Sequence, residues 1–286
     1  MKKLPISLVI ITLNEEQNIA RCIKSAPFVS EIVVLDSGSQ DATGSIAQSL
    51  GARVFVESWQ GYFKQKLRAT ELALHPWILS LDADEALSPE LAREIQGLEF
   101  FEGSDLSGVD GFEMPRLSFH LGRWIRHGGW YPDRQLRLFH RDRAQWQGGM
   151  VHERVAAKKV RRLQGDLYHF VFQDLADQVS TNNEYSGLGA QDLKSRGKRF
   201  SLTLLLLKPW SKFIETYFFK AGFRDGLPGF IISVGAAYSM FLKYAKLWEM
   251  EKRGDGLGSG LGAQVEPAAA QAPASAKALP QTQAEQ

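Results

Sequence analysis

The chain has 286 residues, of which 44% are hydrophobic and 23% are charged. This composition is typical of a globular protein with a sizeable core, and the net charge of +2 is too small to indicate nucleic-acid binding. The single cysteine, Cys22, excludes an internal disulfide and a thiolate metal site, so a reducing cytoplasmic compartment fits.

The first hundred residues alternate between short apolar runs and segments with helical spacing. The pattern predicts strands at 6–12, 31–36, 53–57 and 77–82, and helices at 16–25, 42–50 and 63–74. Such an order builds βαβ units and an α/β fold with a mostly parallel sheet flanked by helices. Ligands bind at the carboxyl ends of these strands. We therefore expect "TLNEE", "LDSGSQDAT", "ESWQG" and "LDADE" to meet at one rim.

The segment "LSLDADEAL" follows the fourth expected strand and contains a D-x-D motif, Asp82 and Asp84. Alternate residues of an extended chain project to the same side, so the two carboxylates would repel unless a cation lies between them. A hard divalent ion such as Mg²⁺ or Mn²⁺, completed by substrate phosphates, meets that need. The alternative is a solvated turn before a helix, which is the commoner origin of a lone D-x-D motif. In the second polar cluster, Asp36 can accept hydrogen bonds from a base or ribose.

Four ordered motifs then carry a resemblance to a known family. The segments "SLVIITLNEEQNI" and "IVVLDSGSQDAT", the pair Gln65-Lys66, and "WILSLDADE" resemble the inverting glycosyltransferases of sequence family two. Further on, "GGWYPDRQLRLF", "VHERV", "LYHF" and "GFIISVGAAYSMFLKYAKLWE" resemble the bacterial branch that adds a sugar to the lipopolysaccharide inner core. One departure is Leu67, where related sequences often have Asn.

The resemblance implies a Rossmann-like GT-A fold and a metal-dependent transfer from a nucleotide-sugar donor. The implied parts are a nucleotide-sugar-binding half (1–110), an acceptor-binding and catalytic half (111–200), membrane-associating helices (201–252) and a disordered tail (253–286). The implied donor-binding residues are Thr12, Asn14, Glu15, Asp36, Lys66 and Asp82, with Asp82 and Asp84 also as metal ligands.

Inverting transfer needs a base for the acceptor hydroxyl. Glu153 in "MVHERV" is our candidate, with His152 as a positioning partner or acceptor contact; the alternative is a strand-edge Glu paired with Arg154 or Arg137. His169 is a third candidate metal ligand, although an isolated His between aromatic residues is more often a hydrogen-bonded core residue.

The segment "GGWYPDRQLRLF" provides further candidate contacts. Its aromatic residues could stack on sugar rings while its charged residues contact hydroxyls, phosphates or the acceptor: Trp130, Tyr131, Asp133, Arg134 and Arg137. The alternative is a structural loop with an internal pair from Asp133 to Arg134 or Arg137. Trp124, Arg126 and His127 are equally ambiguous.

The C-terminal part combines basic and apolar residues. Residues 194–224 contain eight basic side chains and one acidic side chain, and residues 226–242 contain no charge. This apolar stretch is shorter than the roughly 20 residues of a spanning helix, so we expect an interfacial or re-entrant helical hairpin on an anionic cytoplasmic leaflet. A buried helical pair or a dimer contact is the alternative.

We therefore predict a peripheral enzyme of the bacterial inner membrane that moves glucose from UDP-glucose onto a heptose of the lipopolysaccharide core. A polyprenyl-phosphate glycosyltransferase is one alternative. A catalytically silent glycan- or membrane-binding scaffold is another.

Overall fold

The structure is a computed structural model and describes residues 2–98, 106, 108–148 and 153–254. His152 and residues 255–286 of the expected disordered tail (253–286) lie outside the described residues, whereas the first two residues of that predicted tail are helical.

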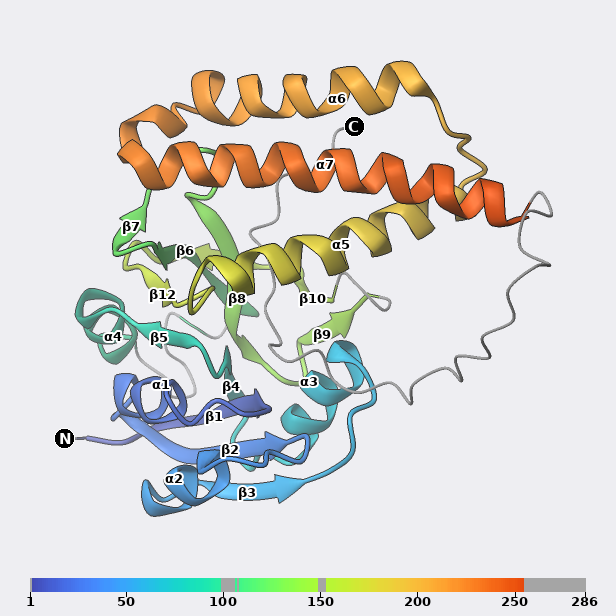
Figure 1. The fold of residues 1–286 in the computed structure, drawn as a ribbon. Helices are drawn as coiled ribbons and strands as arrows, with labels where there is room; N and C mark the ends of the chain where they lie inside the picture. Colours follow the sequence, from blue (N-terminus) through green and yellow to red (C-terminus); the bar gives the residue numbers. More distant parts are fainter. Residues whose placement is uncertain (1, 99–105, 107, 149–152, 255–286) are drawn as a thin grey trace. The chain divides into compact units, whose positions relative to one another are not determined.

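The first half of the sheet is parallel, with the strand order β3-β2-β1-β4 (Figure 1). Its strands are β1 (Leu4–Thr12), β2 (Val29–Asp36), β3 (Arg53–Val56) and β4 (Trp77–Asp82), and its helices are α1 (Ile19–Ser25), α2 (Thr43–Ser49) and α3 (Tyr62–Glu71). These elements confirm the predicted βαβ alternation.

The second half of the sheet is largely antiparallel, so the sheet is mixed rather than mostly parallel as expected. Strand β8 lies between β4 and β6 and is antiparallel to both, while β12 pairs with β5. The bounds are β5 (Glu85–Leu87), α4 (Pro89–Gln96), β6 (Gly111–His120), β7 (Arg123–Ile125), β8 (Asp133–His140), β9 (Ala144–Gln147), β10 (Arg154–Ala157), β11 (Val160–Arg162) and β12 (Leu167–His169). Antiparallel neighbours need no helical crossover, which removes the βαβ signal from this part of the sequence. The α/β class is confirmed.

Strand β1 shows why this sheet forms. Its residues Leu8 and Ile10 belong to one buried apolar cluster, and the intervening Val9 and Ile11 belong to another. Because neighbouring side chains of a strand point to opposite faces, an apolar run with no polar alternation covers both faces of a sheet. The carboxyl end of β1 is thereby fixed beside those of β2 and β4.

Two compact units are distinguished among the described residues. The first contains residues 2–117 and 132–170, and the second contains residues 118–131 and 171–254, with β6 running from one into the other. The second unit contains α5 (Leu175–Ser195), α6 (Leu202–Ile214), a π-helical turn (Glu215–Phe219), a 3-10 turn (Gly222–Asp225) and α7 (Gly226–Gly254). The four-part division expected from the sequence stays a prediction.

Helices α6 and α7 form the expected hairpin and run side by side in Figure 1. The joint between them is tight, because a Cβ on Gly229 would lie 1.9 Å from the carbonyl oxygen of Gly222. The apolar stretch at 226–242 continues into a single helix. The segment Gly222–Arg253 is long and apolar enough to cross a membrane by length and composition, so the expectation that it is too short is corrected.

Candidate active site

The D-x-D motif is buried, which contradicts the solvated-turn alternative. Strand β4 ends at Asp82, and Asp82, Asp84 and the following Glu85 are all nearly inaccessible to solvent. Ionised carboxylates are retained in such surroundings only when cations or hydrogen-bond donors compensate for the lost hydration. The structure supplies different partners to each of the three.

Asp82 lies between two basic side chains. Lys66 Nζ is 3.0 Å from Asp82 Oδ1, and Arg137 Nη2 is 2.7 Å from Asp82 Oδ2. Burial acts to raise the pKa of Asp82, but Arg137 and Lys66 outweigh it and hold the pKa well below its ordinary value. Asp82 is therefore ionised, with protein cations balancing its charge; its role as a metal ligand stays a prediction.

Glu85 continues this network. Its Oε1 lies 2.7 Å from Arg137 Nη2 and 3.4 Å from Arg116 Nη1, and its Oε2 accepts the backbone N–H of Asp82 at 3.1 Å. Burial acts to lower the pKa of Arg137, but Asp82 and Glu85 raise it above its ordinary value. Two residues of this network, Glu85 and Arg116, were absent from the predicted site.

Arg116 is 1% exposed and lies in strand β6 among apolar neighbours. Its Nη2 binds Asp133 Oδ2 at 2.6 Å, so Asp133 pairs with Arg116 rather than with the Arg134 or Arg137 of the structural alternative. Arg134 instead donates to the Leu163 carbonyl at 3.4 Å. Arg116 lies between Pro115 and Leu117 in a mostly apolar strand. An Arg buried in such a strand is normally paired, and that sequence signal could have indicated Arg116.

Asp84 faces His169. Strand β12 pairs with β5 so that His169 lies opposite Glu85, and His169 Nε2 is 3.3 Å from Asp84 Oδ2. Both carboxylate oxygens of Asp84 are buried and have no hydrogen-bond partner among the described residues. A carboxylate and an imidazole that converge in this way fit a divalent cation whose other ligands come from substrate and water. Within the described part of the chain, no group of three or more His, Cys, Asp or Glu residues could hold a metal.

Helix α3 connects Glu153 to the motif. Its Lys66 side chain is buried, and Lys66 Nζ lies 3.1 Å from Glu153 Oε1 as well as 3.0 Å from Asp82 Oδ1. Glu153 therefore pairs with Lys66, not with the expected alternatives Arg154 or Arg137. The Lys66 ammonium group joins the end of β4 to the candidate base, which lies 87 positions after Lys66 in the sequence.

The two loops after β1 and β2 brace each other. Asn14, which adopts a left-handed backbone with φ of 54°, receives the Gln40 N–H on its Oδ1 at 2.8 Å and donates its own N–H to Ser39 Oγ. Asp36 Oδ1 accepts the Gly38 and Ser39 N–H groups at 3.0 and 2.8 Å. These contacts shape a polar rim at the strand ends.

Two further predicted donor contacts lie at this rim. The Glu15 N–H donates to Thr43 Oγ1 at 2.8 Å. The buried Thr12 Oγ1 has no hydrogen-bond partner within the described residues. The nucleotide contacts of all four rim residues stay predictions.

The aromatic candidates belong to the second unit. Trp130 is buried in a cluster with Ile125, Val171, Phe172 and Ile232, which leaves little of its ring exposed; its stacking on a sugar stays a prediction. The remaining candidates of this region contact near neighbours. Arg126 lies over the Tyr131 ring, His127 Nδ1 is 3.1 Å from Asp225 Oδ1, and Trp124 packs edge-on against Phe119.

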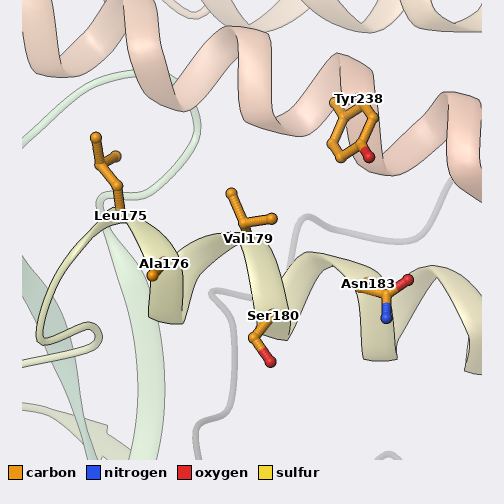
Figure 2. A pocket seen from close by; sticks show the side chains of 6 residues that line it. All are labelled: Leu175, Ala176, Val179, Ser180, Asn183 and Tyr238. Atoms are coloured by element: carbon orange, nitrogen blue, oxygen red, sulfur yellow. The ribbon is translucent and has the colours of Figure 1, made fainter.

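Figure 2 shows a hollow between α5 and α7 in the second unit. Its volume is about 620 Å³, and its lining is mostly apolar: Leu175, Ala176, Val179, Ser180, Asn183 and Tyr238. It contains none of the acidic residues described above, so its chemistry differs from that of the D-x-D site.

Comparison with known proteins identifies the family. The model of glycosyl transferase family 2 matches residues 7–163. The lipopolysaccharide core biosynthesis glycosyltransferase LpsC of Rhizobium meliloti is 34% identical over 255 residues, covering 86% of this chain and 93% of the relative. An uncharacterized glycosyltransferase of Rickettsia typhi is 33% identical over 261 residues, covering 87% of this chain and 88% of the relative.

A solved structure matches a smaller part of the chain. Glucosyl-3-phosphoglycerate synthase from Mycobacterium tuberculosis, in complex with Mn²⁺, UDP-glucose and phosphoglyceric acid, is 26% identical with a TM-score of 0.31 and covers 40% of this chain and 43% of that one. The family match covers more than half of the chain, and it includes every residue of the network around Asp82. The chain belongs to glycosyl transferase family 2 and is a glycosyltransferase.

Proposed function

We propose that this glycosyltransferase inverts the anomeric centre of a hexose, glucose from UDP-glucose, as it moves the sugar onto a heptose of the lipopolysaccharide inner core. The observation that carries the mechanism is the shared cation: Lys66 joins Glu153 to Asp82 at the end of β4. An acceptor base and a donor-binding carboxylate are thereby held at one place in the first unit.

Glu153 is the proposed base. The acceptor hydroxyl attacks the anomeric carbon, its proton passes to the Glu153 carboxylate, and the bond to the nucleoside diphosphate breaks on the opposite face. Lys66 Nζ holds Glu153 Oε1 in place at 3.1 Å.

Asp84 and His169 are the proposed holders of Mg²⁺ or Mn²⁺. The buried Asp84 oxygens lack hydrogen-bond partners among the described residues and lie beside His169, which supports this assignment. When bound, the ion would neutralise the charge that develops on the leaving diphosphate. Asp36, Thr12, Asn14 and Glu15 are the proposed contacts of the nucleoside.

The proposed acceptor follows from the relatives. LpsC is named for lipopolysaccharide core biosynthesis, and its similarity covers most of both chains. A lipid-linked acceptor also agrees with the long apolar helix of the second unit. We place the enzyme at the cytoplasmic face of the inner membrane, as a peripheral protein.

The test is a donor and acceptor screen with the purified full chain. UDP release is measured with Mn²⁺ or Mg²⁺, UDP-glucose and lipopolysaccharide cores of defined truncation, and the anomeric configuration of the product is read by NMR. Transfer to a heptose-terminated core with inversion is expected. Transfer only to polyprenyl phosphate would show that the acceptor is a lipid phosphate and not a heptose. Retention of the anomeric configuration would overturn the role of Glu153.

Asp84→Ala tests the metal site separately. Mn²⁺ affinity in the presence of UDP, followed by electron paramagnetic resonance, should fall at least tenfold because a removed anionic ligand weakens a hard-cation site. Unchanged Mn²⁺ affinity in a folded variant would show that Asp84 is not a ligand of the metal.

A further inference from the structure

We propose that α6, α7 and their joint form a docking surface for an anionic phospholipid bilayer and lie in the plane of its interface. We call the exposed large apolar residues of these elements the hairpin surface; they are Leu202, Leu204, Leu206, Leu207, Trp210, Ile214, Phe218, Phe219, Phe223, Leu227, Phe230, Val234, Tyr238, Phe241 and Trp248. The inference rests on the membrane location within the proposed function and assigns its contact residues.

Helix α6 has an apolar face directed to solvent. Leu202, Leu206 and Trp210 recur every four residues and are all exposed, Trp210 by 70%. Residues at this spacing share one helix face, and Ile214 and Phe218 extend it. None of the 13 residues of α6 is buried, so the helix is not a core element of the second unit.

Helix α7 has both a buried and an exposed side. Its residues Ile232, Tyr244 and Leu247 are buried, whereas Leu227, Phe230, Val234, Tyr238, Phe241 and Trp248 are exposed. The exposed set follows steps of three, four and seven residues and therefore forms one narrow stripe. Tyr238 also lines the hollow of Figure 2 with the exposed Leu175 and Val179, which widens the apolar area toward α5.

An aromatic cluster at the joint connects the two stripes. Phe218 of the α6 side and Phe230 of α7 both contact the rings of Phe213 and Tyr217, with centroid separations between 5.1 and 6.3 Å. The hairpin surface is therefore continuous through the joint. Exposed apolar surface of this extent marks an interaction site, and aromatic side chains favour the membrane interface.

Charge selects an anionic bilayer as the occupant. Lys198 and Arg199 precede α6, and Arg224 lies in the joint; all three are exposed. Between Lys198 and Arg224 the one acidic residue is Glu215, which is paired with Lys212 at 3.1 Å and Lys220 at 2.5 Å. The acidic residues further along are the buried Asp225 and, near the end of α7, Glu249 and Glu251. Basic residues at both ends of an apolar surface attract anionic headgroups while the apolar side chains enter the acyl boundary.

Helix geometry favours lying on the bilayer over crossing it. One side of α7 packs against α5, where Lys246 Nζ binds Asn183 Oδ1 at 2.8 Å and a Cβ on Gly235 would meet Gln178 Nε2 at 2.9 Å. Lipid cannot surround a helix that is covered on one side by polar α5 residues. With 13 residues, α6 is about 20 Å long, shorter than the ~30 Å hydrocarbon core.

The primary test is vesicle flotation of the full chain without any donor or acceptor, so its result is independent of transferase activity. Binding to phosphatidylcholine vesicles that contain phosphatidylglycerol is expected, with little binding to phosphatidylcholine alone. The variant Leu206→Glu/Trp210→Glu should lower the partition coefficient at least tenfold. The matched control is Val56→Glu/Leu74→Glu in the first unit, whose apolar side chains are 70% and 73% exposed and should not affect binding.

Charge and depth are tested with single changes. Arg224→Glu should weaken binding to anionic vesicles about threefold to tenfold and reduce its salt sensitivity, whereas Lys24→Glu on α1 should not. Brominated lipids should quench the tryptophan fluorescence of wild type more strongly than that of Trp210→Phe. Because Trp210→Phe keeps an apolar ring, it replaces the Leu206→Glu/Trp210→Glu variant if that variant fails to fold.

Three outcomes would overturn the inference. Equal vesicle binding by Leu206→Glu/Trp210→Glu and wild type would show that the hairpin surface does not contact the bilayer. Resistance of the bound protein to a carbonate wash would indicate a spanning α7. Absence of vesicle binding together with self-association that the double variant abolishes, measured by sedimentation, would assign the surface to a second copy of the chain.

Discussion

The first unit buries charge, whereas the second unit exposes apolar side chains. In the first, Lys66, Asp82, Arg137, Glu85, Arg116 and Asp133 form one chain of buried ion pairs. In the second, α6 presents Leu206 and Trp210 to solvent and has no buried residue. Both patterns reverse the usual distribution of polar and apolar residues, and such local violations are expected at functional sites.

The two reversals differ in how they affect stability. Each buried charge of the first unit has lost hydration and depends on its neighbour, so removing one partner leaves an uncompensated charge. An exposed leucine or tryptophan of the second unit contributes little to folding because it has few contacts to lose. Substitutions in the first unit should therefore alter stability or catalysis, and those on the hairpin surface should alter binding.

The largest effect is expected for Glu153→Gln. The amide has nearly the same shape but cannot accept the acceptor proton, so kcat should fall by about 10²–10⁴. Affinity for UDP, measured by calorimetry, should change little because the donor site is otherwise intact. A kcat within about threefold of wild type would place the base elsewhere.

Arg137→Met tests the buried network through stability. The substitution leaves Asp82 and Glu85 without their shared partner, so the free energy of unfolding should fall by about 3–5 kcal/mol. Urea unfolding measures the loss. Adding Glu85→Gln should recover part of the loss, because one of the two carboxylates that have lost Arg137 is then uncharged; strictly additive losses would argue against the coupling.

Glu31 on β2 gives a pH-dependent prediction for the same unit. Burial acts to raise its pKa, but hydrogen bonds from Ser7 and the Leu74 N–H, together with Arg53, lower it below its ordinary value. The ionised carboxylate thus stabilises the fold above its unfolded pKa of about 4.3, and this contribution is lost as the pH falls through the lower folded value. Glu31→Gln should cost about 1–2 kcal/mol at pH 7, with a difference from wild type that narrows below about pH 4. A difference that is constant with pH would exclude this linkage.

The smallest effect on folding is expected for Trp210→Ser. Its side chain is exposed, so the free energy of unfolding should change by no more than about 0.5 kcal/mol. A polar replacement for a core residue such as Leu79, which is fully buried, should by contrast be strongly destabilising. Thermal unfolding without lipid measures both; a large loss for Trp210→Ser would show that α6 is packed in solution.

Local sequence patterns determined the first half of the fold. Continuous apolar runs and helical spacing identified β1 through β4 and the helices between them, and thereby the polar rim at their ends. Predicted helix starts were less accurate: the segment expected from residue 16 becomes helical only at Ile19. Apolar length alone also underestimated α7, because the helix continues past its uncharged part.

Only the tertiary structure decided which charges meet. The sequence singled out Asp82, Asp84, Lys66, Glu153 and His169, yet it left their partners open. Lys66 reaches Glu153 because α3 packs beside the end of β4, and His169 faces Asp84 because β12 pairs with β5. Periodicity reports contacts between residues close in sequence, whereas these contacts join segments far apart in the chain. The burial that makes each charge depend on its neighbour arises only when those segments pack together.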